Sequence, residues 1–73
     1  SAQDNTWDFI FKKAQNDPEI MSAVMDVASN HPDGEMVQSL LQSKAKDKAD
    51  AYLRAKHLVK ITVLRVLFAK SCP

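Results

Sequence analysis

The sequence is poor in residues that make turns and cross-links: its 73 residues include one glycine, three prolines and one cysteine. An all-β fold of this size needs frequent turn residues, and Gly34 alone cannot build a glycine-rich phosphate-binding loop. The lone Cys72 cannot form an internal disulfide, and a zinc site is excluded because only His31 and His57 could join it. We therefore expect an all-α protein without a nucleotide-binding loop, a disulfide scaffold, a metal or another cofactor.

Long apolar runs are also missing. From Leu58 to Ala69 nine of twelve residues are apolar, but Lys60, Thr62 and Arg65 interrupt the run. A bilayer span needs about 20 mostly apolar residues, so we expect no transmembrane segment. No signal peptide is visible, and because the chain begins at Ser1 rather than Met we expect a processed protein or a fragment. The compartment is left open.

Charge is distributed unevenly along the chain. Residues 1–43 hold two cations and seven anions, a net charge of −5, whereas residues 44–73 hold eight cations and two anions, a net charge of +6. In one interpretation the acidic part docks on a basic last helix, with the charges at the rims of the packed faces. In the other, the basic helix offers a surface to an anionic partner such as nucleic acid or a membrane surface.

Apolar residues recur at helical spacing through most of the sequence. The pattern predicts a small single-domain bundle over residues 1–73. Its four helices are expected at about residues 6–16, 18–30, 33–43 and 47–70.

Helix starts are marked by capping residues. Thr6 or its neighbours, Asp17 and Asp33 are of the types that accept hydrogen bonds from the first amides of a helix, and Pro18 suits the first helical position. The lysine-rich stretch that follows the third helix contains no glycine or proline, and we place the last break near residues 44–47.

The last helix is apolar on two sides. One arc holds Tyr52, Val59, Val63, Val66 and Leu67, and the nearly opposite arc holds Leu58, Ile61, Phe68 and Ala69. Either the other three helices wrap both sides, or the second side meets a partner such as another copy. An interface of that kind, including a homodimer through the last helix, would use Leu58, Ile61, Arg65 and Phe68. An intermolecular disulfide through Cys72 stays open.

No pattern points to catalysis. The pairs His31/Asp33 and His57/Asp50 lack a third orienting group, and a histidine beside a proline at a helix end is typical of a turn. We expect a protein that is not an enzyme.

The segment from Asn16 to Asn30 reads NDPEIMSAVMDVASN and is followed by His31 and Pro32, and then by Met36 and Leu40. It resembles the DP-repeat (STI1) family of heat-shock-chaperone cochaperones, whose motif reads Asp-Pro-Glu, an apolar stretch, Met-Asp, and then Asn-Pro before the next helix. The likeness covers roughly residues 16–42.

The resemblance implies a short-helix domain with an apolar groove for hydrophobic client segments or an amphipathic helix. Methionine suits such a groove because its flexible thioether conforms to varied partners. The implied groove would be lined by Ile20, Val24, Met25, Val27, Met36, Leu40 and Leu41. We therefore expect a protein–protein interaction module that binds a protein or peptide. The alternatives are a basic-helix protein that binds nucleic acid or an anionic surface, and a secreted effector that binds a partner protein.

Overall fold

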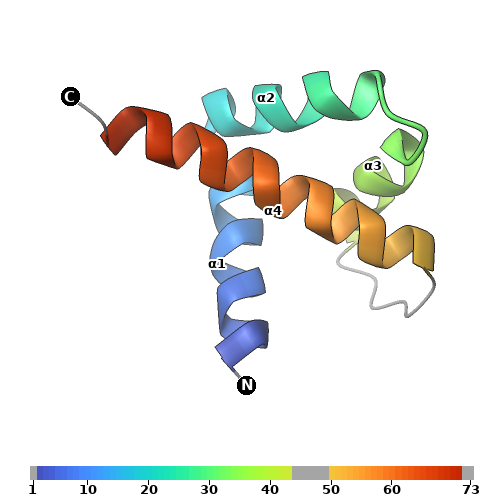
Figure 1. Ribbon diagram of the computed structural model, residues 1–73, viewed down its shortest axis with the longest axis horizontal. Helices are drawn as coiled ribbons and strands as arrows, with labels where there is room; N and C mark the ends of the chain where they lie inside the picture. The colour runs from blue at the N-terminus through green and yellow to red at the C-terminus, as the bar shows by residue number, and fades with distance from the viewer. Residues whose placement is uncertain (1, 44–49, 72–73) are drawn as a thin grey trace.

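The computed structural model describes residues 2–43 and 50–71 of the chain, and this part contains four α-helices and no strand. The helices are α1 (Ala2–Asn16), α2 (Pro18–Ser29), α3 (Gly34–Ser43) and α4 (Asp50–Ser71). In Figure 1, α4 crosses the front of the molecule, α2 runs beside it in the opposite direction, and α1 crosses behind it. The predicted all-α fold is confirmed. The predicted break at residues 44–47 and the predicted start of the last helix at residue 47 lie outside the described residues.

The start of α1 differs from the prediction. The helix begins at Ala2, so Thr6 lies inside it and does not occupy the cap position. No glycine or proline interrupts residues 2–6, so nothing in this stretch prevents a helix from beginning before Thr6. The sequence Asp-Asn-Thr was therefore wrongly interpreted as a helix boundary.

The junction between α1 and α2 is the one that the sequence predicts. The Asp17 carboxylate accepts hydrogen bonds from the backbone amides of Glu19 (3.0 Å) and Ile20 (3.3 Å). Pro18 takes the first helical position, where its missing N–H leaves no bond unmade. The cap and the proline together start a new helix one residue after α1 ends.

The single glycine lies where α2 and α3 touch. A Cβ atom on Gly34 would come within 1.9 Å of the Ala28 carbonyl oxygen in the last full turn of α2. The Gly34 N–H donates to the His31 carbonyl (3.0 Å), and the Val37 N–H donates to the Asp33 carbonyl (3.1 Å), so Asp33 precedes α3 as predicted. Gly34 thus allows the chain to reverse tightly between the two helices.

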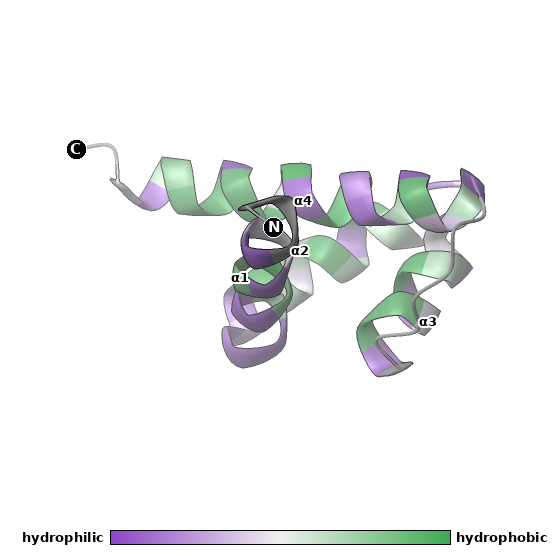
Figure 2. Ribbon diagram, turned by 90° about the horizontal axis from the view of Figure 1, so that it is seen from below, coloured by the Kyte–Doolittle hydropathy of each residue, from purple (hydrophilic) through white to green (hydrophobic). Residues whose placement is uncertain are grey.

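All four helices contribute to one core. Its fully buried larger side chains are Phe11, Ile10, Ile20, Leu40, Val24, Val37, Val59 and Val63. A view at 90° to the first places α1, α2 and α3 on the same side of α4 (Figure 2). α4 therefore buries one side only, and the interpretation in which the other helices wrap both of its sides is wrong for the described residues.

Candidate functional site

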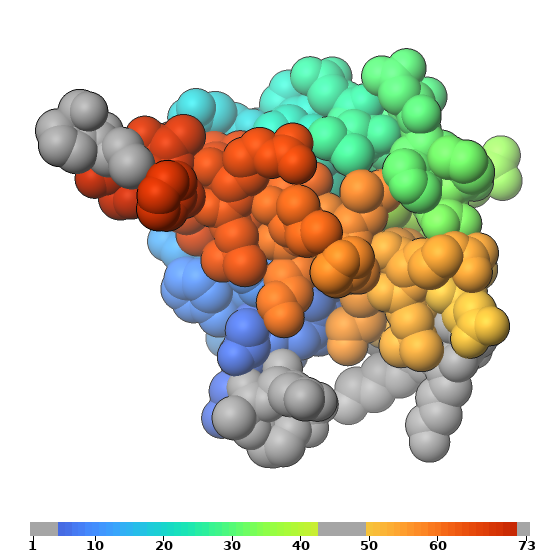
Figure 3. Space-filling view, in the orientation of Figure 1, coloured from blue at the N-terminus to red at the C-terminus, as the bar shows by residue number. Residues whose placement is uncertain are grey.

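The outer side of α4 is apolar and uncovered. Four large apolar side chains on it are exposed by 72% (Phe68), 52% (Leu53), 44% (Leu64) and 40% (Ile61). At about 100° per residue they fall within an arc of about 80°, so they form a single line along the helix. We call these four residues the outer stripe. Figure 3 shows α4 running across this face from its yellow to its red end with no other helix laid over it.

The C-terminal half of the outer stripe is hollowed. The shallow depression is lined entirely by α4, with Ile61, Leu64, Arg65, Leu67, Phe68 and Ser71 around it. A depression with apolar walls accepts a protruding apolar side chain from another molecule better than a flat surface does.

A second hollow of about 390 Å³ lies at the other end of the stripe, between α4 and the turn that joins α2 to α3. It is lined by His31, Asp33, Leu53, Arg54, His57 and Leu58. Because Leu53 belongs both to this hollow and to the outer stripe, the two depressions follow one another along the same helix.

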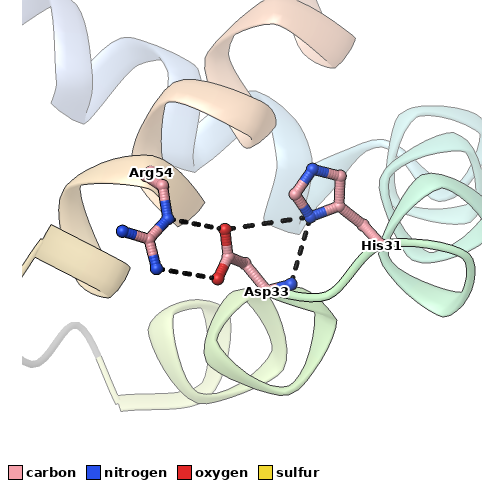
Figure 4. A network of polar contacts seen from close by, with 3 residues as sticks. All are labelled: His31, Asp33 and Arg54. Atoms are coloured by element: carbon pink, nitrogen blue, oxygen red, sulfur yellow. Dashed lines mark hydrogen bonds and ion pairs between the residues drawn. The ribbon is translucent and has the colours of Figure 1, made fainter.

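Figure 4 shows the polar network in the second hollow. Arg54 donates from Nε to Asp33 Oδ2 (3.0 Å) and from Nη2 to Asp33 Oδ1 (3.2 Å), a bidentate pair that joins α4 to the start of α3. The hydrogen bond from Arg54 and its positive charge hold the pKa of Asp33 below its ordinary value of 3.8. The same pair raises the pKa of Arg54. The carboxylate is therefore ionised and engaged, which suits a structural pair better than a general base.

His31 completes this network as a turn residue. Its Nδ1 accepts a hydrogen bond from the Asp33 backbone N–H (3.1 Å) and lies 3.8 Å from Asp33 Oδ2. The His31 N–H in turn donates to the Ala28 carbonyl (3.2 Å). This confirms the predicted turn role of His31. In residues 2–43 and 50–71, no three His, Cys, Asp or Glu side chains are grouped to hold a metal ion.

The other end of α4 is held by a second charged cluster. Lys70 Nζ lies 2.8 Å from Glu19 Oε2 and 3.5 Å from Asp17 Oδ2, and the hydrogen bond to Glu19 raises the pKa of Lys70. Partial desolvation acts to raise the pKa of Asp17, but the amides of Ile20 and Glu19 and the Lys70 charge lower it. Acidic residues of the first part of the chain thus pair with Arg54 and Lys70, in agreement with the interpretation that the two charged parts dock.

The predicted groove residues on α2 and α3 do not line an open groove in this structure. Ile20, Val24, Leu40 and Leu41 are buried in the core, because the faces that the sequence pattern assigned to a ligand are covered by the protein's own helices. Three further predicted residues, Met25, Val27 and Met36, are half-buried.

The second predicted set lies closer to an accessible surface. Ile61, Arg65 and Phe68 are exposed on α4, and Leu58 is half-buried. The prediction missed Leu53 and Leu64, although their helical spacing places both on the arc of Ile61 and Phe68. The helical spacing was visible in the sequence. It was obscured at Leu64 because apolar and charged residues follow one another directly over residues 63–66.

Comparisons of the chain with models of protein families, with curated proteins and with solved structures found no match. Within the described residues, none of the four helices combines the length and the apolar character that crossing a membrane requires.

Proposed function

We propose that the protein is a non-catalytic protein-binding module and that it binds its partner along the outer stripe of α4. The observation that carries the proposal is the exposure of Leu53, Ile61, Leu64 and Phe68 in one line on a helix whose other side is buried. Single apolar residues on a surface are ordinary, whereas an aligned set with a hollow beside it is typical of an interaction site.

The chaperone-like alternative places the ligand between α2 and α3. The half-buried Met25 and Met36 support it, since they pack against the core and belong to the set that the DP-repeat resemblance assigns to a client. It requires Ile20 and Leu40 to leave the core, where they are 0% and 1% exposed. The outer stripe needs no such rearrangement, and we therefore prefer it.

The nucleic-acid alternative asks for several cations on one accessible face. Arg54 and Lys70 are paired with carboxylates, and the Lys56 ammonium lies over the rings of Trp7 (4.8 Å) and Tyr52 (5.9 Å). The face that remains accessible is mainly apolar, which suits a protein partner better than phosphates.

The test is an NMR titration of the isotope-labelled chain with an uncharged amphipathic helical peptide that carries leucines at i, i+4, i+7 and i+11. We expect saturable amide shifts centred on residues 57–71. The variant Leu64→Asp should abolish them, whereas the matched control Ser22→Asp, at an exposed position on α2, should leave them unchanged. Shifts confined to residues 18–42 would instead favour the α2–α3 groove, and an unresponsive spectrum would refute both sites.

A further inference from the structure

Beyond its first turn, α4 carries charge of one sign. From Ala51 to Ser71 the sequence contains five Lys and Arg residues and no Asp or Glu. The one acidic residue of α4, Asp50, lies in its first turn, so a partner laid along Ile61, Leu64 and Phe68 meets a stretch of helix whose own charges are all positive.

Two of these five cations flank the outer stripe without an internal partner. Arg54 and Lys70 are held by carboxylates and Lys56 lies over aromatic rings. Lys60 and Arg65 are exposed, and within the part of the chain that the structure describes neither is paired with a carboxylate. At about 100° per residue they lie on opposite sides of the stripe, so the apolar line runs between two positive edges.

This pattern disfavours a second copy of the chain as the occupant. Two outer stripes packed face to face over Ile61, Leu64 and Phe68 would bring together four cations, Lys60 and Arg65 from each copy, and residues 51–71 contain no Asp or Glu to separate them. Like charges at the rim of an interface suppress association.

A flat anionic bilayer is also disfavoured. Ile61 and Leu64 are still more than half covered by neighbouring atoms, which leaves only part of each side chain to enter a bilayer. A lipid surface takes up a broad protruding apolar face, whereas the open apolar depression beside Arg65 can receive the side chains of a second helix.

We infer that the partner of the outer stripe is an acidic amphipathic helix. Its apolar residues, spaced at i, i+3 or i+4 and i+7, lie against Ile61, Leu64 and Phe68, and its Asp or Glu residues on either side of that line meet Lys60 and Arg65. The inference rests on the proposed function and adds the charge of the partner to it.

The experiment compares three helical peptides that share the same leucine positions and differ only at the flanking positions, which are Glu, Gln or Lys. Each exposed ion pair changes an affinity by up to about fivefold, and replacing Glu by Lys turns attractions into repulsions. We expect the Glu peptide to bind the full chain about tenfold more tightly than the Lys peptide at low salt. The gap should narrow at high salt because exposed charges are screened.

Charge reversal on the protein is the decisive control. The double variant Lys60→Glu with Arg65→Glu should prefer the Lys peptide, whereas the matched variant Lys12→Glu with Lys13→Glu, exposed on α1, should keep the preference for the Glu peptide. Far-UV circular dichroism of both variants checks that the helices are retained.

The outcomes separate this inference from the proposal on which it rests. Equal affinity for the three peptides would overturn the acidic partner and leave the protein-binding module standing, whereas no binding by any peptide would overturn the module itself. If sedimentation velocity shows a dimer and Leu64→Asp dissociates it, the outer stripe belongs to a second copy of the chain. If the protein binds phosphatidylserine vesicles and shows no preference among the three peptides, the outer stripe belongs to a membrane surface. Either result would overturn the acidic helix.

Discussion

The two sides of α4 have similar residue types and different surroundings. The inner side buries Tyr52, Ala55, Val59, Thr62 and Val63 against the other helices, and the outer side exposes the stripe of Leu53, Ile61, Leu64 and Phe68. Even the one buried polar side chain of the inner side is satisfied, because the Thr62 hydroxyl donates to the Leu58 carbonyl (2.8 Å). Hydrophobicity alone therefore does not separate the residues that hold the fold from those left to a partner.

The largest expected difference between the two sides follows from placing the same charge on each. Val63→Asp buries a carboxylate at a position that is 0% exposed and should cost several kcal/mol, on the order of the whole stability of a domain this small. Leu64→Asp, at the adjacent outer position, should cost only about 1 kcal/mol, through lower helix propensity and partial loss of burial. Urea denaturation followed by circular dichroism measures both, and equal losses would contradict the division of α4 into two sides.

A substitution at Gly34, where the chain turns from α2 into α3, should have an intermediate effect on the free energy of unfolding. Gly34→Ala places a methyl group against the Ala28 carbonyl oxygen, and relieving that contact should cost about 1–3 kcal/mol. The exposed Ser22→Ala on α2 serves as the control, since alanine favours a helix and creates no contact there. Thermal denaturation compares the stability of the two variants. A Gly34→Ala protein as stable as the control would show that the turn between α2 and α3 can widen without loss of stability.

The smallest effect belongs to the ion pair at the edge between the two sides. Because Arg54 lowers the pKa of Asp33 below 3.8 in the folded protein, the unfolded chain binds the proton first as the pH falls. The contribution of the pair is complete above about pH 5 and is lost as the pH falls through the lowered pKa. Asp33→Asn should therefore weaken the fall in the free energy of unfolding at acidic pH. In a protein that already carries Arg54→Gln, the same substitution should change this pH dependence little. An acid limb that is unchanged in Asp33→Asn would contradict this assignment.

Local signals in the sequence predicted the helices well. Asp17 and Pro18 start α2 as expected because a cap and a fixed φ act within a few residues. The start of α1 was missed because Asp, Asn and Thr are acceptable both as caps and inside a first turn. Residues 44–47, where the last break was expected, lie outside the described residues.

The candidate site was less predictable. Ile20 and Leu40 have the spacing of a helix face that could meet either a ligand or the rest of the chain, and only the packed structure shows that the chain itself covers them. Leu64 was overlooked although its spacing matches that of Ile61 and Phe68. Periodicity identifies an apolar face, but what covers that face is a property of the tertiary arrangement.

The charged contacts at the two ends of α4 agree with the way the helix is rotated about its own axis. A cylinder that is apolar on opposite sides could satisfy the core after a rotation of about half a turn, but that rotation would carry Arg54 away from Asp33 and Lys70 away from Glu19. Exposed ion pairs contribute little to stability, so they reinforce an orientation that the packing of the smaller inner residues Ala55, Thr62 and Val63 already favours. Packing and charge pairing thus favour the same orientation of α4, and that orientation decides which residues the molecule presents to the outside.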